Sequence, residues 1–228
     1  MHGMPEAAAA ELTAAEPDHD CPLCPRLVDF RLANRVAEPG WHNAPVRSFG
    51  DPDARLLIVG LAPGLRGANR TGRPFTGDYA GELLYQTLIE FGFATGTYLA
   101  DPADGLVLND CMVTNAVRCV PPQNKPTPGE VATCRRFLIG RIAALDRLEA
   151  VLALGRIAHE STLIALGARR AAFPFAHGAK HAVRPNLTLF DSYHCSRYNT
   201  STGKLTPQMF KAVLQAIRDH LGPSRAGS

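Results

Sequence analysis

Residues 55–60 read RLLIVG, a short apolar run that ends in glycine, and they give the strongest indication of the fold. A continuous apolar run of this length is typical of a strand that is buried on both faces of a parallel sheet. Similar runs follow at 107–117, 150–155 and 187–193. We therefore expect four parallel strands.

Helical patterns separate these strands. They cover residues 81–91, 129–148 and 156–166, and a last amphipathic stretch at 207–221 follows Thr206, a suitable cap for a helix that begins with proline. Alternating strands and helices predict an α/β fold, here a three-layer α/β/α sandwich with a central four-stranded parallel sheet. In such sheets ligands bind beyond the carboxyl ends of the strands, so the loops there are expected to carry the function.

Length and composition favour one soluble domain. The chain has 228 residues, 46% of them hydrophobic, and a single domain is expected over residues 19–221. Residues 1–18 are rich in Ala, Glu and Asp and have no aromatic residue, and residues 222–228 are small and polar, so a disordered N-terminal tail and a flexible C-terminal tail are expected. No apolar run approaches the roughly 20 residues that cross a bilayer, and no secretory signal is visible. A cytoplasmic protein is expected, and a net charge of +3 does not by itself indicate DNA binding.

The cysteines suggest a metal centre, because cysteines in a reducing compartment more often bind metal than form disulfides. Two pairs, a CPLC motif and a second pair that flanks a proline-rich loop, could meet at one centre: Cys21, Cys24, Cys119 and Cys134. Four thiolates can bind either zinc or an iron–sulfur cluster. Cys111, in a predicted strand, and Cys195, in the last loop, are expected to be unliganded.

Two loops after the first strand have unusual composition. Residues 60–64 read GLAPG, in which glycine allows close approach of the backbone and proline stiffens the turn. The run GANRTGRPFTGDYAG at 67–81 then contains Phe75 and Asp78. A loop of this length is uncommon in a compact domain unless it has a function.

Two further candidates follow later strands. Asn115 has an amide that can donate and accept hydrogen bonds at the edge of a base. His194 lies in YHCSRYNTSTG, after the last strand. Taken singly, each is more often structural. Basic residues recur in the same three loops, as expected if the loops converge on DNA: Arg66, Arg70 and Arg73, then Arg118 and Lys125, then Arg197 and Lys204.

Together these motifs resemble the uracil-DNA glycosylase superfamily, most closely its family 5 (type b) branch, from Cys21 to the last helix. GLAPG, GANRTGRPFTGD, Asn–Ala–Val–Arg–Cys–Val–Pro–Pro at 115–122 and the His–x–Ser–x–x–Asn loop occur in the family's order. The resemblance implies a four-stranded parallel sheet, a 4Fe–4S cluster, and removal of uracil and other deaminated bases, such as hypoxanthine or xanthine, from DNA. By position the cluster ligands would be Cys21, Cys24, Cys119 and Cys134.

The resemblance also implies roles for individual residues. The flipped base would stack on Phe75 and be bound at its edge by Asn115, while His194 stabilises the departing base and Asp78 orients water or stabilises the sugar cation. The catalytic residues would be Asp78, Asn115 and His194. The base would be bound by Gly60, Ala62, Gly64, Phe75 and Asn115. DNA would be bound by Arg66, Arg73, Ser196, Arg197, Tyr198 and Asn199, with Tyr198 filling the gap left by the flipped nucleotide.

Two departures from the superfamily pattern stand out. Leu61 and Ala62 occupy positions where other branches have an acid, which is the family 5 condition, and Cys195 stands where proline is usual. The expected partner is double-stranded DNA, bound by a monomer. The alternatives are a family 4-like uracil-DNA glycosylase with narrower specificity, an iron–sulfur redox or sensing protein, and a noncatalytic DNA-damage binder that would not need His194.

Overall fold

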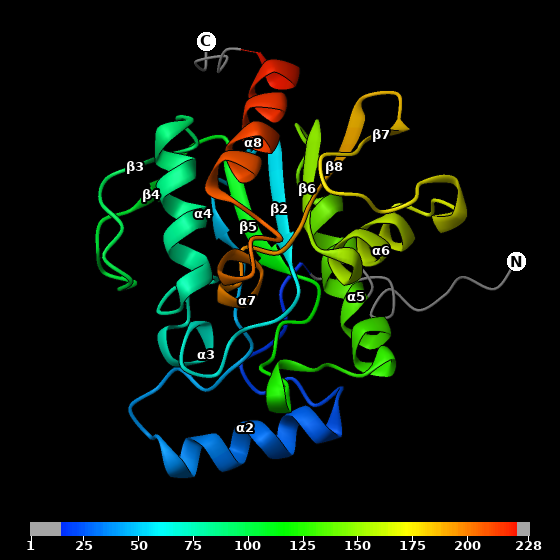
Figure 1. Ribbon diagram of the computed structural model, residues 1–228. Coiled ribbons are helices and arrows are strands. Elements are labelled where there is room, and N and C mark those ends of the chain that lie inside the picture. The colour runs from blue at the N-terminus through cyan, green and yellow to red at the C-terminus, as the bar shows by residue number, and fades with distance from the viewer. Residues whose placement is uncertain (1–14, 223–228) are drawn as a thin grey trace, which may run out of the picture.

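A β-sheet with helices on both faces forms the centre of the computed structural model, which describes residues 15–222 (Figure 1). The sheet has six strands in the order β1-β5-β2-β6-β8-β7. Its four inner strands are parallel: β2 (Leu56–Gly60), β5 (Cys111–Asn115), β6 (Ala150–Leu154) and β8 (Leu187–Ser192). The α/β sandwich and its four parallel strands are therefore confirmed.

The expected total of four strands is wrong, because two antiparallel strands close the edges of the sheet. β1 (Phe49–Gly50) pairs with β5, and β7 (Lys180–Arg184) pairs with β8. β1 has only two residues, and β7 alternates exposed and half-buried side chains. Neither has the continuous apolar run that marks a strand buried on both faces.

The run expected at 107–117 is also divided. Val107–Leu108 forms β4, which pairs with β3 (Ala94–Thr95) in a separate two-stranded sheet. Asp110 has a positive φ of 54°, so the chain turns sharply before β5 begins.

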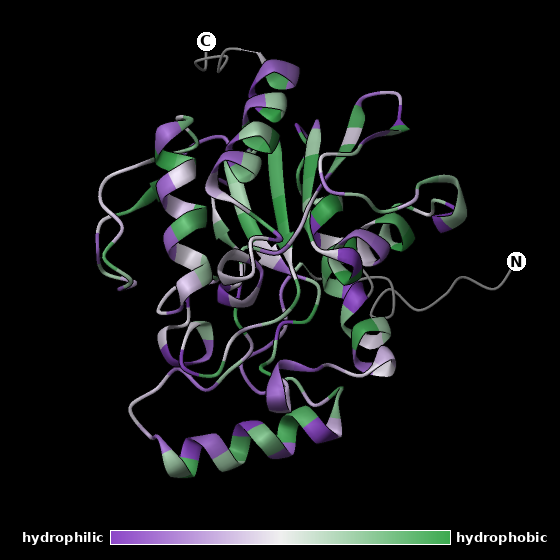
Figure 2. Cartoon of the chain, in the orientation of Figure 1, coloured by the Kyte–Doolittle hydropathy of each residue, from purple (hydrophilic) through white to green (hydrophobic). Residues whose placement is uncertain are grey.

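Helices cover the two faces of the sheet in pairs. One face packs on α4 (Tyr79–Glu90) and α8 (Pro207–Leu221), and the other on α5 (Pro128–Ala143) and α6 (Arg156–Ala165). The inner strands are mostly hydrophobic, as Figure 2 shows, and all of their residues are buried. α8 has the predicted bounds and its Thr206 cap, which accepts a hydrogen bond from the amide of Met209, whereas α5 ends before Leu148.

The shorter elements gather at the carboxyl ends of the parallel strands. They are α3 (Ala68–Thr71), α7 (Arg197–Ser201) and the 3-10 turn η1 (Pro122–Asn124), while η2 (Arg170–Ala172) follows α6. α2 (Pro25–Ala37), the first helix of the described chain, lies at the same end of the molecule as α3 (Figure 1).

Part of the predicted N-terminal tail contacts the domain. The Glu16 carboxylate pairs with Arg118 at 2.7 Å and with Arg141 at 2.6 Å, and it lies mostly out of solvent. Residues 1–14 and 223–228, which make up the rest of the two predicted tails, lie outside the described residues. Within residues 15–222, none of the helices has the length and apolar content to cross a membrane.

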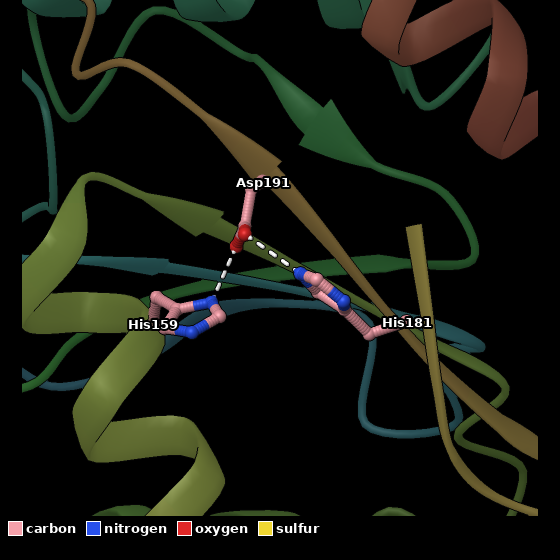
Figure 3. Close-up of side chains that lie close together, drawn as sticks. All are labelled: His159, His181 and Asp191. Atoms are coloured by element: carbon pink, nitrogen blue, oxygen red, sulfur yellow. Dashed lines mark hydrogen bonds and ion pairs between the residues drawn. The ribbon is translucent and has the colours of Figure 1, made fainter. Parts of the chain in front are cut away.

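A buried network of polar side chains joins three elements on the side of α6 (Figure 3). Asp191 of β8 contacts His159 Nδ1 of α6 at 2.7 Å and His181 Nε2 of β7 at 3.1 Å. His159 Nε2 lies 2.9 Å from the carbonyl oxygen of Phe173, which can only accept a hydrogen bond. Both nitrogens of His159 therefore face acceptors, and the ring satisfies both when it is an imidazolium.

This network predicts a pH dependence of stability. Burial lowers the pKa of His159, but the hydrogen bond and charge of Asp191 outweigh burial and raise the pKa above its usual value. The stabilisation is fully present below the unfolded pKa of about 6.5 and is lost as pH rises through the raised folded pKa. Urea unfolding between pH 6 and 9 should show the free energy of unfolding falling with pH, and less steeply in Asp191→Asn. An equally steep slope in that variant would contradict this assignment.

Candidate active site

A cavity of about 840 Å³ lies at the carboxyl edge of the parallel strands, where the sequence placed the function. The loops after β2, β6 and β8 and the start of α4 line it. Its lining includes Ala62, Gly64, Asp78, Gly155, Arg156 and His194.

Asp78 is the N-cap of α4, and its carboxylate accepts a hydrogen bond of 3.3 Å from the amide of Gly81. The other side of the carboxylate lies against Gly67, where an added Cβ would come within 2.5 Å of Asp78 Oδ2. The absence of a side chain at Gly67 therefore leaves room for the carboxylate beside the cavity. Burial raises the pKa of Asp78, and backbone N–H groups of Gly81 and Ala80 partly oppose that shift.

Phe75 has a left-handed backbone with φ of 53°, which is costly for an aromatic residue and is more frequent at functional sites. Its carbonyl oxygen accepts a hydrogen bond of 3.1 Å from the Tyr98 hydroxyl, which helps to hold this conformation. The ring packs over Gly60, where a Cβ would lie 2.5 Å from Phe75 Cζ and 2.4 Å from Asn115 Oδ1. Only glycine at position 60 allows both side chains to approach this closely.

Asn115 ends β5, and its side chain is 2% exposed. Its Oδ1 atom is buried and has no hydrogen-bond partner among residues 15–222. Because an unpaired buried acceptor is costly, it is expected to meet a donor when the site is occupied.

His194 follows β8, and its ring is stacked on Phe75 with centroids 5.7 Å apart and planes 27° apart. Burial lowers the pKa of His194 to about 4, so the ring is neutral at pH 7 and has one N–H donor. The carbonyl oxygen of His194 accepts a hydrogen bond of 2.8 Å from Asn199 Nδ2. Ser196 accepts one from the amide of Asn199, so hydrogen bonds hold the turn although Cys195, which is buried in the core, replaces proline.

The expected residues come together only in part. Asp78, Ala62, Gly64 and His194 line the cavity, whereas Phe75 and Asn115 do not, and they are only 6% and 2% exposed. In this conformation the His194 ring covers Phe75. A base can stack on Phe75 only if His194 shifts.

Two of the expected DNA contacts need correction. Arg73 is buried and forms two hydrogen bonds of 2.8 and 2.7 Å with Asp104, so it has no free group for phosphate. Its guanidinium also lies over the rings of Phe49, Tyr85 and Tyr98. The side-chain amide of Asn199 is bound to the backbone of His194, which makes it a positioning group.

The other expected DNA contacts remain accessible. Arg66, Ser196 and Arg197 line the cavity, and Arg197 lies 5.2 Å over the ring of Tyr79. Ser196 also caps α7 with its hydroxyl. Tyr198 is 73% exposed, as a side chain that enters the base stack would have to be.

The four paired cysteines gather in a separate small cluster with Leu27, Val117, Val131 and Phe137. Cys24 caps α2, Cys134 lies on α5, and Cys119 lies between β5 and η1. Cys134 Sγ accepts a hydrogen bond of 3.2 Å from the amide of Arg118, and Arg31 Nη1 lies 3.9 Å from Cys119 Sγ. Burial and the neighbouring thiols raise the pKa of Cys119 to about 12 and that of Cys134 to about 11. A metal centre would have to supply the positive charge that stabilises thiolates here.

Some residues of the cavity were not expected from the sequence. Tyr79, Asn124, Arg156 and Ile157 line it in addition to the residues above. The sequence pattern predicts Arg156 only as the first residue of a helix. Arg156 comes directly after AVLALG, a strand that runs parallel to β2. Its position at the carboxyl end of this strand could have identified it as a residue of the site.

Comparisons with known proteins agree with these motifs. Residues 47–218 match the family model for the Uracil DNA glycosylase superfamily. The chain is 46% identical over 219 residues to the Type-5 uracil-DNA glycosylase of Thermus thermophilus, an alignment that covers 93% of this chain and 96% of the relative. It is 39% identical over 211 residues to the Type-5 enzyme of Mycobacterium bovis, covering 89% of this chain and 78% of that relative. It is 36% identical over 110 residues to the Type-4 uracil-DNA glycosylase of Thermotoga maritima, an alignment that covers 48% of this chain and 49% of the relative.

Proposed function

This chain belongs to the uracil-DNA glycosylase superfamily, and from that premise we propose that it excises uracil from DNA in the cavity beside His194. The observation that carries the proposal is the buried, unpaired Oδ1 of Asn115. Uracil has an N–H group at N3, which can donate to this oxygen, whereas N3 of cytosine is an acceptor. Asn115 can therefore select uracil by a hydrogen bond that cytosine would leave unmade.

The proposed reaction begins with flipping of the nucleotide, since a stacked base cannot reach the cavity. The base displaces the His194 ring from Phe75 and stacks on Phe75 in its place. When the bond between C1′ and the base nitrogen breaks, its electron pair stays with the base. The neutral His194 would donate a hydrogen bond to the developing anion, and the carboxylate of Asp78, which lines the same cavity, would stabilise the sugar cation and accept a proton from the water that attacks C1′.

We extend the proposal to larger deaminated bases. Hypoxanthine and xanthine also have a ring N–H beside a carbonyl group, so either can bind Asn115 as uracil does. Once the His194 ring shifts from Phe75, the adjoining cavity of about 840 Å³ would give room for a purine. We also propose that the substrate is duplex DNA, that exposed Tyr198 fills the gap in the stack, and that the enzyme acts as a monomer in the cytoplasm.

For the cysteine cluster we propose a 4Fe–4S centre that Cys21, Cys24, Cys119 and Cys134 bind. In a tetrahedral zinc site with Zn–S bonds of about 2.3 Å, the sulfur atoms are roughly 4 Å apart. The four sulfur atoms do not form a group whose members all lie within 4.8 Å of one another, which favours a larger centre. Hydrogen bonds from Arg118 and Arg31 to sulfur are also typical of cluster sites.

An excision assay tests the function, and Asp78→Asn tests the mechanism. The protein should convert a uracil-containing duplex into one that alkali cleaves at the abasic site, while leaving the matching cytosine duplex intact. Asp78→Asn keeps the shape of the side chain but removes its charge, so the single-turnover rate should fall about tenfold to a hundredfold. An inactive wild-type protein would contradict the function, and an unaffected Asp78→Asn variant would contradict the role of the carboxylate.

A further inference from the structure

Two aromatic rings with a cation at each end form a strip that extends from the start of α6 at the cavity to the segment after α7. Arg156 Cζ lies 5.7 Å over the ring of Phe175, whose centroid is 6.2 Å from that of Tyr193. Lys204 Nζ lies 4.9 Å over the ring of Tyr193. We call these four residues the cation–aromatic strip.

The strip meets the active site at Arg156 and at Tyr193. Arg156 begins α6 and lines the cavity. Tyr193 directly precedes His194, and its backbone amide donates a hydrogen bond of 3.2 Å to His177 Nδ1, while the His177 ring stacks on Tyr193 at 5.0 Å. The strip is therefore held in place next to the reacting centre.

Its two cations are exposed and have no carboxylate partner among the described residues. Glu160, one helical turn from Arg156, would be the usual partner, but it pairs with Arg170 at 3.3 Å instead. Elsewhere, Arg55, Arg73 and Arg118 each pair with a carboxylate. Aromatic rings hold these two exposed cations in place, and no carboxylate of the described residues neutralises them. Such cations are suited to bind anions.

We propose that the strip binds the phosphodiester backbone of the DNA beside the flipped nucleotide, with Arg156 and Lys204 each contacting a phosphate. This proposal rests on the proposed function, because only a DNA substrate brings phosphates to the cavity. Arg66 and Arg197, which lie among the cavity residues, would bind the backbone nearer to α3 and α7. Three arginines that line the cavity, Arg66, Arg156 and Arg197, would then contact the backbone, which suits an enzyme that must hold a distorted duplex.

The salt dependence of duplex binding tests the strip. Fluorescence anisotropy of an undamaged duplex and of a uracil duplex should show that Arg156→Ala and Lys204→Ala each reduce the slope of log Kd against log salt by about one. Each should weaken binding roughly tenfold at 0.1 M salt, with the loss appearing in Kd and apparent KM. Arg147→Ala is the matched control, because Arg147 is also exposed but precedes β6 at the opposite edge of the sheet.

Methylphosphonate substitution locates the contacts. Neutralising the phosphate that Arg156 binds should weaken wild-type binding about as much as Arg156→Ala does, with no further loss when both changes are combined. Arg156→Lys, which keeps the charge, should retain most of the slope. Slopes of Arg156→Ala and Lys204→Ala equal to that of Arg147→Ala would overturn the proposal. Because an undamaged duplex reports binding without excision, this outcome is distinct from a failure of the glycosylase function.

Discussion

Replacing His194 with alanine is expected to lower the single-turnover rate of uracil excision by roughly 10²–10³-fold, the usual cost of removing a preorganised donor to a developing anion. The geometry supports a large contribution of His194 to the rate of excision. Ala62 provides no carboxylate near the reacting sugar, so charge on the departing base is the main target for stabilisation. A ring whose pKa is lowered to about 4 stays neutral at pH 7 and acts as a hydrogen-bond donor without giving up its proton.

The pH profile separates this role from general acid catalysis. A neutral His194 with pKa near 4 should leave the rate independent of its own titration above about pH 5. His194→Gln, which can still donate a hydrogen bond, should recover part of the rate lost in His194→Ala. If His194→Ala were nearly as active as wild type while Asp78→Asn was inactive, stabilisation of the leaving group would not be the main source of rate.

The stacked pair of His194 and Phe75 also matters for this experiment, because the His194 ring covers the face of Phe75 on which we propose that the base stacks. Alanine at 194 opens the space over Phe75. Uracil as a free base should therefore bind His194→Ala no more weakly than wild type, even though excision is slower. This split between binding and rate would be hard to explain if His194 were only a structural residue.

The inner sheet was predictable because each inner strand is buried on both faces, which leaves an uninterrupted apolar run such as Leu56–Val59. The carboxyl-edge rule then located Asp78 and His194 correctly. β7 was missed because an edge strand needs no such run: its residues Lys180–Arg184 are only partly buried. Sequence pattern therefore identified the elements that form the core and overlooked those that border it.

The errors at the site have a different physical cause. Arg73 and Arg118 lie in basic loops, as Arg66 and Arg197 do. The local sequence therefore could not separate the arginines that pair with a carboxylate from those that line the cavity. Their partners, Asp104 and Glu16, are distant in the sequence, and only the fold brings those carboxylates into contact. Conversely, Arg156 is one of the cations left without such a partner, and the chain offers no local indication of this.

Cys134→Ala should release the metal centre and unfold α2 locally while the central sheet remains folded. α2 buries only Leu27, Arg31 and Asn34. The guanidinium of Arg31 contacts Cys119 Sγ and donates a hydrogen bond to the carbonyl oxygen of Cys21. Both contacts are expected to be lost when the cysteines separate. The remaining ties of α2 are polar: Arg26 forms two hydrogen bonds of 2.7 Å with Glu130, and Asn43 is hydrogen-bonded to Arg35 and to the carbonyl oxygen of Asn34.

Hydrogen exchange and metal analysis measure this outcome. A structural metal site supplies folding free energy directly, and a local loss on the order of 3 kcal/mol corresponds to roughly 10²-fold less protection of the α2 amides. Amides of β2 and β6 should keep their protection, since their strands lie in the main core. Cys111→Ala is the matched control: Cys111 is equally buried but lies in β5, outside the cysteine cluster, so its replacement should leave the iron content unchanged. Wild-type protein with stoichiometric zinc and no iron after anaerobic preparation would contradict the 4Fe–4S assignment, and unchanged α2 protection in Cys134→Ala would show that the centre does not hold this helix.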